Sequence, residues 1–335
     1  MPPFWSSSND DGGPSKVVDK QRKKAVSCNA SSSSRDAASA LIRFGLSSLV
    51  YEVAKVLVPK VVCFCSRRSR RKVKVLGVIP ARYNSTRFPG KPLADLGGEP
   101  MIWHTYTNAL KSKCFDKLVV ATDDERIAQC VRGFGAEVVM TSEDCTNGTE
   151  RCLEALNTLT GGGREAYDIV VNVQGDEPFI EAEHIVKVVD CIRIGMDKGD
   201  ASVVMGTLAR PANKMDAEDV TNVNNVKVVL DVNYNALYFS RAMIPFNKKG
   251  KYDPSCLYWR KLGIYSYRAD FLDKYVNEMP PSLLQKQEDL EQNKVIESGY
   301  NIKVGIVEKA VHGVDTPEQL KHLNSMLKTK KGIYI

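Results

Sequence analysis

The chain has 335 residues, and its 43% hydrophobic and 26% charged content is typical of a globular protein and argues against wholesale disorder. The net charge of +7 arises from a basic excess in the N-terminal part, since residues 1–72 contain 14 Lys and Arg against 5 Asp and Glu. The remainder is slightly acidic, so nothing indicates nucleic-acid binding by the globular part. Nine Cys without a CxxC pair, together with four His, disfavour a zinc site and favour free thiols in a reducing compartment.

The N-terminal extension begins with a polar stretch. Residues 1–40 are rich in Ser, Asn, Asp, Gly and Lys and cannot form a hydrophobic core, so we predict that they are disordered. This stretch is basic and Ser-rich like a transit peptide, but its four Asp residues make it a poor match to one.

An apolar stretch follows at residues 41–65, LIRFGLSSLVYEVAKVLVPKVVCFC, and it is long enough to span a membrane. Four charged residues, Arg43, Glu52, Lys55 and Lys60, oppose insertion, because a charge near the centre of a span costs about 2.5–3.5 kcal/mol. An amphipathic helix lying on a surface is therefore an equal alternative. We predict an anchor-like segment at residues 41–72 that associates the protein with a membrane, its Arg cluster and the globular part facing the cytosol; a soluble cytosolic protein is the alternative.

From residue 73 onward, strand patterns alternate with helix patterns. This alternation predicts an α/β fold with a mostly parallel central sheet flanked by helices, and a ligand site at the carboxyl ends of the strands. We predict one domain at residues 73–328 and a tail at 329–335. The predicted strands are 75–79, 118–122, 136–140, 168–173, 201–208, 226–231, 236–239, 260–267 and 302–307, and the predicted helices are 100–112, 124–133, 149–159, 181–195, 268–276, 286–298 and 316–328.

The stretch VLGVIPARYNSTRFPGKPL, residues 75–93, is the most informative part of the chain. A buried strand ends at Pro80 in a loop that carries Arg82, Arg87, Gly90 and Lys91. Guanidinium groups, an ammonium and backbone N–H groups in a glycine-containing loop are what a phosphate group needs. The loop therefore predicts a phosphate-binding site, and the missing GxGxxG argues against a nicotinamide-dependent dehydrogenase.

Three further stretches carry candidate site residues. In NGTER, residues 147–151, a turn begins a helix that Thr149 is predicted to cap. In NVQGDEP, Asp176 follows a buried strand, where a carboxylate would point into the crevice and bind Mg²⁺ beside phosphate. Asp315 lies just before the last predicted helix, where its role could be structural alone.

The stretches IPARYNSTRFPGKPL, VVATDDERI, NGTER, VNVQGDEP, NNVKVVLD, ALYFSRAMIP, LGIYSYR, DLEQ and GVDTPEQL occur in this order. In this they resemble the CMP-3-deoxy-D-manno-octulosonate (CMP-Kdo) synthetases, over residues 73–328. The resemblance implies a Rossmann-like nucleotide-diphospho-sugar transferase fold with a dimerisation insert, and a homodimer. It also implies synthesis of CMP-Kdo and diphosphate from CTP and Kdo. Plant members carry a hydrophobic anchor and associate with mitochondria, which suggests the outer mitochondrial membrane.

The resemblance also assigns roles to individual residues. It implies that catalysis depends on three residues, that four residues bind the nucleotide, that two carboxylates hold Mg²⁺, and that five residues bind the acceptor sugar. The catalytic residues are Arg87, Lys91 and Asp176, and the nucleotide-binding residues are Arg82, Arg87, Lys91 and Arg151. The Mg²⁺ ligands are Asp176 and Asp315, and the sugar-binding residues are Gln174, Lys261, Tyr265, Glu291 and Gln292.

Two positions depart from the family pattern. Lys261 stands where the family usually has His, and Asn293 stands where it usually has Leu. A Lys can replace the charge of a His but not its shape or its pKa. Two alternatives therefore stay open: a cytidylyltransferase for another acidic sugar such as a sialic acid, and a divergent CTP-binding paralogue with little activity.

Overall fold

The computed structural model describes residues 72–85, 87–163, 166–212, 217–308 and 313–329, which belong to one compact unit, Lys72–Ile335. The predicted disordered stretch at 1–40 and nearly all of the anchor-like segment at 41–72 lie outside these residues. Within the described ranges, no helix is long and apolar enough to cross a membrane.

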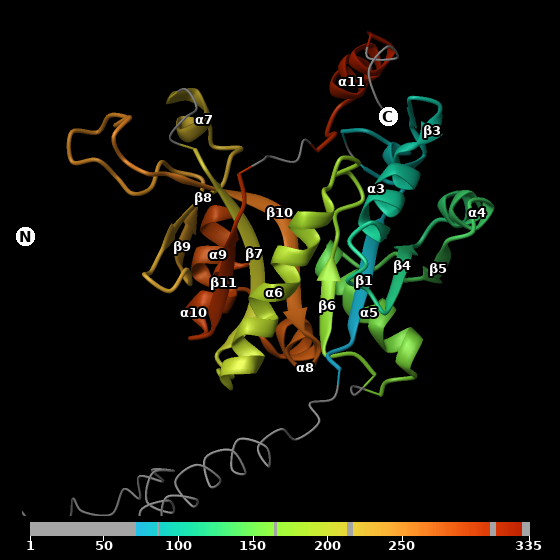
Figure 1. The fold of residues 1–335 in the computed structure, drawn as a ribbon, viewed down its shortest axis with the longest axis horizontal. Helices are drawn as coiled ribbons and strands as arrows, with labels where there is room; N and C mark the ends of the chain where they lie inside the picture. The colour runs from blue at the N-terminus through green and yellow to red at the C-terminus, as the bar shows by residue number, and fades with distance from the viewer. Residues whose placement is uncertain (1–71, 86, 164–165, 213–216, 309–312, 330–335) are drawn as a thin grey trace, which may run out of the picture. The chain divides into compact units, whose positions relative to one another are not determined.

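The centre of the fold is a sheet whose main path has the strand order β11-β7-β10-β6-β1-β4-β5 (Figure 1). Neighbouring strands pair in parallel along β6-β1-β4-β5 and between β7 and β11, whereas β10 pairs antiparallel with both β6 and β7. Strand β10 is therefore the one strand of this path that runs against the others. The mostly parallel sheet is thus confirmed. The strands are β1 (Val75–Ala81), β4 (Lys117–Thr122), β5 (Glu137–Met140), β6 (Ile169–Asn172), β7 (Val203–Pro211), β10 (Trp259–Arg268) and β11 (Asn301–Ile306).

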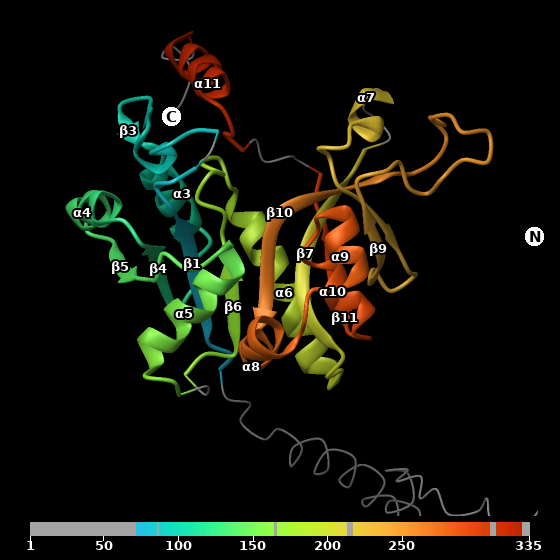
Figure 2. The ribbon, with the colours of Figure 1, turned by 180° about the vertical axis from the view of Figure 1, so that it is seen from behind.

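Helices cover both faces of the sheet, and alternate residues of each strand serve the two cores. Leu76 and Val78 of β1 lie in one core cluster, while Val75 and Ile79 lie in the other. This two-sided burial explains why the strands read as continuous apolar runs. The covering helices are α3 (Met101–Leu110), α4 (Glu125–Gly133) and α6 (Ala182–Lys198) on one face, and α5 (Gly148–Thr160), α8 (Ala269–Asp273) and α10 (Asn293–Glu297) on the other (Figures 1 and 2).

An insert lies between β7 and β10. It contains the short helix α7 (Ala217–Thr221) and the hairpin of β8 (Lys227–Leu230) with β9 (Ala236–Ser240), and β8 also pairs with β10. A long loop leads from β9 back to β10 and extends away from the sheet (Figure 2).

All nine predicted strands are present, but some other predictions were wrong. The helix expected at 286–298 is two helices, α9 (Leu283–Glu288) and α10, because Asp289 adopts a left-handed φ of 51° and ends the first. The helix expected at 268–276 is α8 followed by a π-helical turn, η2 (Lys274–Glu278). Three small elements were not predicted: α7, the 3₁₀ turn η1 (Lys91–Leu93) and the hairpin β2–β3 (Asp95–Leu96, Glu99–Pro100).

The last helix, α11 (Pro317–Thr329), docks on the β2–β3 hairpin. Asn324 accepts a hydrogen bond from the Gly97 N–H at 2.8 Å and donates one to the Asp95 carbonyl at 2.9 Å. At the other end, the Gln319 side chain accepts from the backbone N–H of Asp315 at 2.6 Å. These contacts fix the start of α11, and with it Asp315, beside the segment that follows the phosphate loop.

Candidate active site

The candidate site lies at the carboxyl ends of β1, β4, β5 and β6, as expected for parallel strands. The loops after β1 and β6 approach each other closely, because a Cβ on Gly175 would lie 2.7 Å from the Pro80 carbonyl oxygen. Glycine is therefore needed in the QGDEP stretch so that the two loops can meet. Their meeting brings the cationic loop and the Asp176 carboxylate into one pocket.

Lys91 is the centre of the charged part of the site. Its ammonium lies 2.7 Å from Asp176 Oδ2 and 3.7 Å from Asp315 Oδ1, and its side chain is only 13% exposed. Arg87 reaches Asp315 Oδ1 at 3.3 Å from the rim, with its side chain 69% exposed. The Val314 N–H donates to the Asp176 carbonyl at 2.9 Å, so the backbone itself holds the two acidic segments together.

Asp176 and Asp315, predicted as Mg²⁺ ligands, are therefore neighbours in space although they are 139 positions apart in the chain. Both carboxylates converge on one positive charge, the Lys91 ammonium. Mg²⁺ in phosphate-binding sites is held by one or two carboxylates plus phosphate oxygens, so this donor set fits the ion. Among the described residues, no cluster of three or more His, Cys, Asp or Glu forms a metal cage independent of substrate.

The opposite side of the pocket is formed by the start of α5. Asn147, not Thr149 as predicted, caps this helix by accepting from the N–H groups of Thr149 and Glu150. Arg151 lies in the first turn of α5, directly after Glu150. Its guanidinium is buried and donates hydrogen bonds to Asp123 at 3.0 Å and to Thr141 at 2.5 Å. Arg151 therefore lines the pocket with an orientation already fixed by the ends of β4 and β5.

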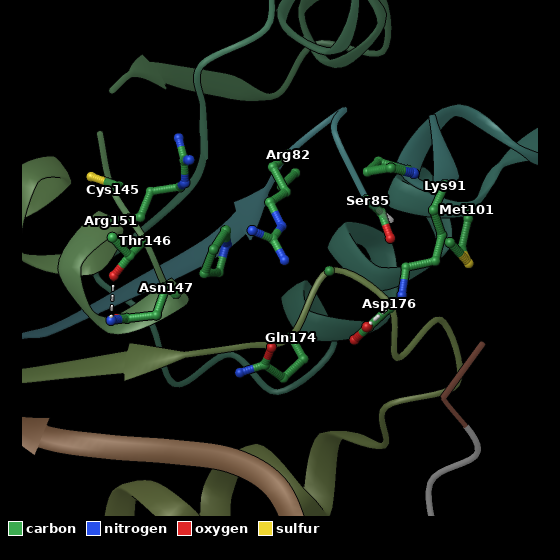
Figure 3. A pocket seen from close by; sticks show the side chains of 15 residues that line it. Arg82, Ser85, Lys91, Met101, Cys145, Thr146, Asn147, Arg151, Gln174 and Asp176 are labelled. Carbon is green, nitrogen blue, oxygen red and sulfur yellow. Dashed lines mark hydrogen bonds and ion pairs between the residues drawn. The ribbon is translucent and has the colours of Figure 1, made fainter. Parts of the chain in front are cut away.

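Figure 3 shows Lys91 and Asp176 facing each other, with Arg82 lying between them and Arg151. The pocket thus contains five of the predicted site residues, Arg82, Lys91, Arg151, Gln174 and Asp176. Its other lining residues are Pro80, Ala81, Ser85, Pro92, Met101, Cys145, Thr146, Asn147, Gly148 and Gly175. Of these, Ser85 and Asn147 are polar residues for which the sequence predicted no role in binding.

The other predicted sugar-binding residues form a second, more buried group around Tyr265. The Lys261 ammonium lies 4.4 Å from the centre of the Tyr265 ring, a cation–π distance. The Tyr265 hydroxyl donates to Gln292 Oε1 at 3.3 Å. Glu291 accepts from the Thr149 hydroxyl at 3.0 Å, which links this group to the helix that carries Arg151.

The break between α9 and α10 is what presents Glu291 and Gln292 to this group. Glu288 ends α9 and accepts hydrogen bonds from the Tyr238 and Ser240 hydroxyls and from the Arg241 N–H, at 2.7–2.9 Å. A continuous helix, as predicted from the sequence, would not hold these side chains in the same place.

Glu177 also belongs to this second group, although its position in QGDEP gave no prediction of a role. A Cβ on Gly263 would lie 2.7 Å from Glu177 Oε1, so β10 packs directly against the carboxyl group. Burial and the neighbouring Asp176 charge raise the pKa of Glu177 to about 8. Burial likewise lowers the pKa of Lys261 to about 8, against the opposing effect of Glu291 and Glu177.

At pH 7 these pKa values leave Lys261 charged and Glu177 largely protonated. Burial also raises the pKa of Glu291. Lys261 therefore presents a positive charge beside the largely protonated Glu177 and the uncharged side chains of Tyr265 and Gln292. An anionic, polyhydroxylated ligand matches this combination.

Several buried polar atoms of the second group have no hydrogen-bond partner within the described ranges. They are Asn172 Nδ2, Glu177 Oε2 and Gln292 Nε2. Asn172 lies directly across from Tyr265 in the β6–β10 register. Buried polar groups are normally satisfied, so these atoms mark a surface that hydroxyl or carboxylate groups of a ligand can complete.

Asn293, the second departure from the family pattern, lies elsewhere. Its side chain is buried, and its Nδ2 donates to the Phe239 carbonyl at 3.1 Å. It thus connects α10 to the β8–β9 hairpin. Among its observed bonds, none reaches the residues around Tyr265, so its role in the described structure is to fix α10.

Comparison with known proteins agrees with this geometry. The cytidylyltransferase family profile matches residues 76–304, more than half of the chain. The chain belongs to the cytidylyltransferase family. Its relatives include 3-deoxy-manno-octulosonate cytidylyltransferases from Arabidopsis thaliana, named mitochondrial, at 46% identity over 80% of this chain and 88% of the relative, and from Zea mays, at 45% identity over 77% and 82%. The family and fold predictions are thereby confirmed.

A solved structure of this cytidylyltransferase class is also similar. CMP:2-keto-3-deoxy-manno-octonic acid synthetase complexed with CTP matches at 36% identity with a TM-score of 0.68, over 77% of this chain and 99% of that one. The match includes nearly the whole of that protein.

Proposed function

We propose that this cytidylyltransferase forms CMP-Kdo and diphosphate from CTP and 3-deoxy-D-manno-octulosonate. The observation that carries the proposal is the convergence of Asp176 and Asp315 on Lys91, in a pocket that adjoins the buried group around Tyr265. The first part suits a nucleoside triphosphate and the second an anionic sugar. The names of the relatives and the CTP bound to the similar structure support both assignments.

In the proposed reaction, the anomeric C2 hydroxyl of the sugar attacks the α-phosphorus of CTP in line, and diphosphate leaves. A P–O bond to the sugar forms as the P–O bond to diphosphate breaks, and the hydroxyl proton is released. Lys91, Arg82 and Arg87 stabilise the charge that develops on the phosphate oxygens. No covalent intermediate with the protein is required, so catalysis results from positioning and charge neutralisation.

Asp176 and Asp315 are the residues that would hold Mg²⁺. When bound, the ion would neutralise phosphate charge and make the sugar hydroxyl more acidic. Lys91 would then contact a phosphate oxygen in place of the carboxylates, because a second cation would displace its ammonium from them.

Lys261, Tyr265, Gln174, Glu291 and Gln292 are proposed to bind the acceptor. Lys261 would pair with the sugar carboxylate, while the unpartnered amide groups would bind hydroxyls. A sialic acid also carries a carboxylate and is the alternative acceptor. The relatives favour the octulosonate.

The test is diphosphate release by the full chain with CTP, Mg²⁺ and either Kdo or N-acetylneuraminate, with the product identified by mass spectrometry. CMP-Kdo formation with Kdo alone is expected. A Lys261→His variant is assayed in parallel. Activity only in the variant would mean that Lys261 has impaired the acceptor site. No product in either, with CTP still bound, would favour the weakly active paralogue.

We also propose a homodimer formed through the insert. Val223, Phe246 and Leu257 in this region are 61%, 71% and 45% exposed, which is unusual for large apolar side chains and is typical of interfaces. Light scattering of the full chain should give the mass of a dimer, and Phe246→Asp should give a monomer. A dimer that persists in Phe246→Asp would argue against this surface.

Membrane association through residues 41–72 completes the proposal, with the outer mitochondrial membrane as the site and the catalytic domain in the cytosol. The apolar and basic composition of this segment and the mitochondrial designation of the Arabidopsis relative support it. Fractionation of cells that express the full chain, beside a chain beginning at Val73, tests it. Recovery of both proteins in the soluble fraction would favour the cytosolic alternative.

A further inference from the structure

Tyr83 organises the loop that carries the phosphate-binding residues. Its carbonyl oxygen accepts from the N–H groups of Ser85 at 3.0 Å and Gly90 at 2.9 Å, which closes the loop on itself. Its ring also packs on Gly90, where a Cβ would lie only 3.1 Å from the ring. Gly90 has a φ of 70° and directly precedes Lys91, so the position of the Tyr83 ring helps to decide where the Lys91 ammonium lies.

Arg126, on α4, covers the exposed side of this ring. Its guanidinium carbon lies 3.3 Å from the centre of the Tyr83 ring. Asp124 holds the guanidinium from behind, with Nε donating to Oδ1 at 3.0 Å and Nη2 to Oδ2 at 2.5 Å. The Asp124 side chain also caps α4 by accepting from the Arg126 N–H at 2.9 Å, so the guanidinium is fixed to the end of the helix.

The turn after β4 therefore holds two arginines through two successive carboxylates. Asp123 fixes Arg151 inside the pocket, while Asp124 fixes Arg126 on the outside of the phosphate loop. Asp123, Asp124 and Arg126 lie in the stretch VVATDDERI, whose acidic and basic side chains have no role in the proposed reaction.

We propose that Arg126 is a positioning residue for triphosphate binding. Asp124 orients its guanidinium, the guanidinium holds the Tyr83 ring against Gly90, and the ring in turn fixes the loop that presents Lys91. Arg126 itself touches no substrate. A planar guanidinium held by a bidentate carboxylate can stack on a ring in one orientation, whereas a Lys ammonium at this position would keep the charge but lose both the fork and the stacking.

The inference rests on the proposed CTP site, so CTP binding is measured separately from turnover. Calorimetric titration of the full chain with CTP and Mg²⁺, without acceptor, is compared for wild type, Arg126→Lys and Arg126→Gln. Arg132→Gln is the matched control, because Arg132 lies on the same helix and forms an exposed ion pair with Glu125. We expect both Arg126 variants to raise the Kd and the KM for CTP about five- to thirtyfold. The KM for the acceptor, the midpoint of thermal unfolding and the control variant should not change.

A double-mutant cycle tests whether Arg126 acts through Tyr83. Tyr83→Leu should weaken CTP binding, and adding Arg126→Gln to it should cause little further loss, because both changes remove the same contact. Full additivity of the two effects would overturn the inference. So would unchanged CTP affinity in Arg126→Gln, or a lowered unfolding midpoint together with equal losses in all kinetic parameters. Failure of the wild type to bind CTP would overturn the proposed function and this inference together, and is distinguishable from these outcomes.

Discussion

The two parts of the candidate site differ in how their polar groups are satisfied. In the nucleotide part, Lys91, Asp176 and Arg151 have charged partners within the protein, at 2.7–3.0 Å. In the acceptor part, Asn172, Glu177 and Gln292 each have a buried polar atom without a partner in the described structure. Charged groups that exchange one partner for another suit a ligand that brings its own charge and metal. Buried neutral groups that have no hydrogen-bond partner suit a ligand that is recognised by its hydroxyls.

The largest expected effect comes from removing a carboxylate of the nucleotide part. Asp176→Asn and Asp315→Asn should each lower kcat by about a thousandfold or more, because each removes a carboxylate that would hold the Mg²⁺ needed to neutralise phosphate charge. Steady-state diphosphate release measures this, with circular dichroism to show that the fold is retained. Asp270→Asn is the control, since Asp270 pairs with Arg268 at the surface. Near-normal activity of either variant would remove that residue from the metal site.

A smaller effect, confined to the acceptor, is expected from Gly263→Ala. The added Cβ would lie 2.7 Å from Glu177 Oε1, so the carboxyl group must move within the buried cavity. We expect the KM for Kdo to rise about tenfold or more, with the Kd for CTP unchanged. Gly133→Ala is the control, because a Cβ there meets nothing within 4 Å. Equal losses for CTP and Kdo would mean that the two parts are not separate.

The pH dependence should also distinguish the two parts. Lys261 has a pKa lowered to about 8 by burial, so it loses its charge as the pH rises through 8, while Glu177, with a pKa raised to about 8, gains a negative charge. Both changes oppose an anionic acceptor. We expect the KM for Kdo to rise about tenfold per pH unit above 8, with a flat KM for CTP. Lys261→Arg should weaken this dependence, because Arg stays protonated. An acceptor KM that is constant to pH 9.5, a value about 1.5 units above these pKa values, would contradict the assignment.

The smallest effect is expected from Asn293→Leu, which restores the residue usual in the family. Asn293 donates to the Phe239 carbonyl, away from the Tyr265 group, so neither KM should change by more than about twofold. Loss of this one hydrogen bond should be offset by removal of the unpartnered Asn293 Oδ1. A large change in the KM for Kdo would mean that Asn293 belongs to the acceptor part of the site.

The sequence predicted the nucleotide part better than the acceptor part. Arg82, Lys91 and Asp176 lie in the segments that follow buried strands, and parallel strands bring their carboxyl ends together, so local patterns suffice to place them. Glu177 was not predicted, because its importance depends on burial under Gly263 of a distant strand. Arg126 was missed for the same reason: its contact with Tyr83 joins the phosphate loop to α4, and the two residues are 43 positions apart in the chain.

Local chemistry in the sequence determined the strands, the sheet type, the cationic loop and the family. Apolar runs, glycine turns and charged residues at strand ends each report on their own neighbourhood. Only the tertiary structure decided that 286–298 is broken between α9 and α10, that Asn147 caps α5, and which buried groups have no partner. These features depend on packing between segments far apart in the chain, and burial, which sets both the pKa values and the unsatisfied groups, exists only after those segments have come together.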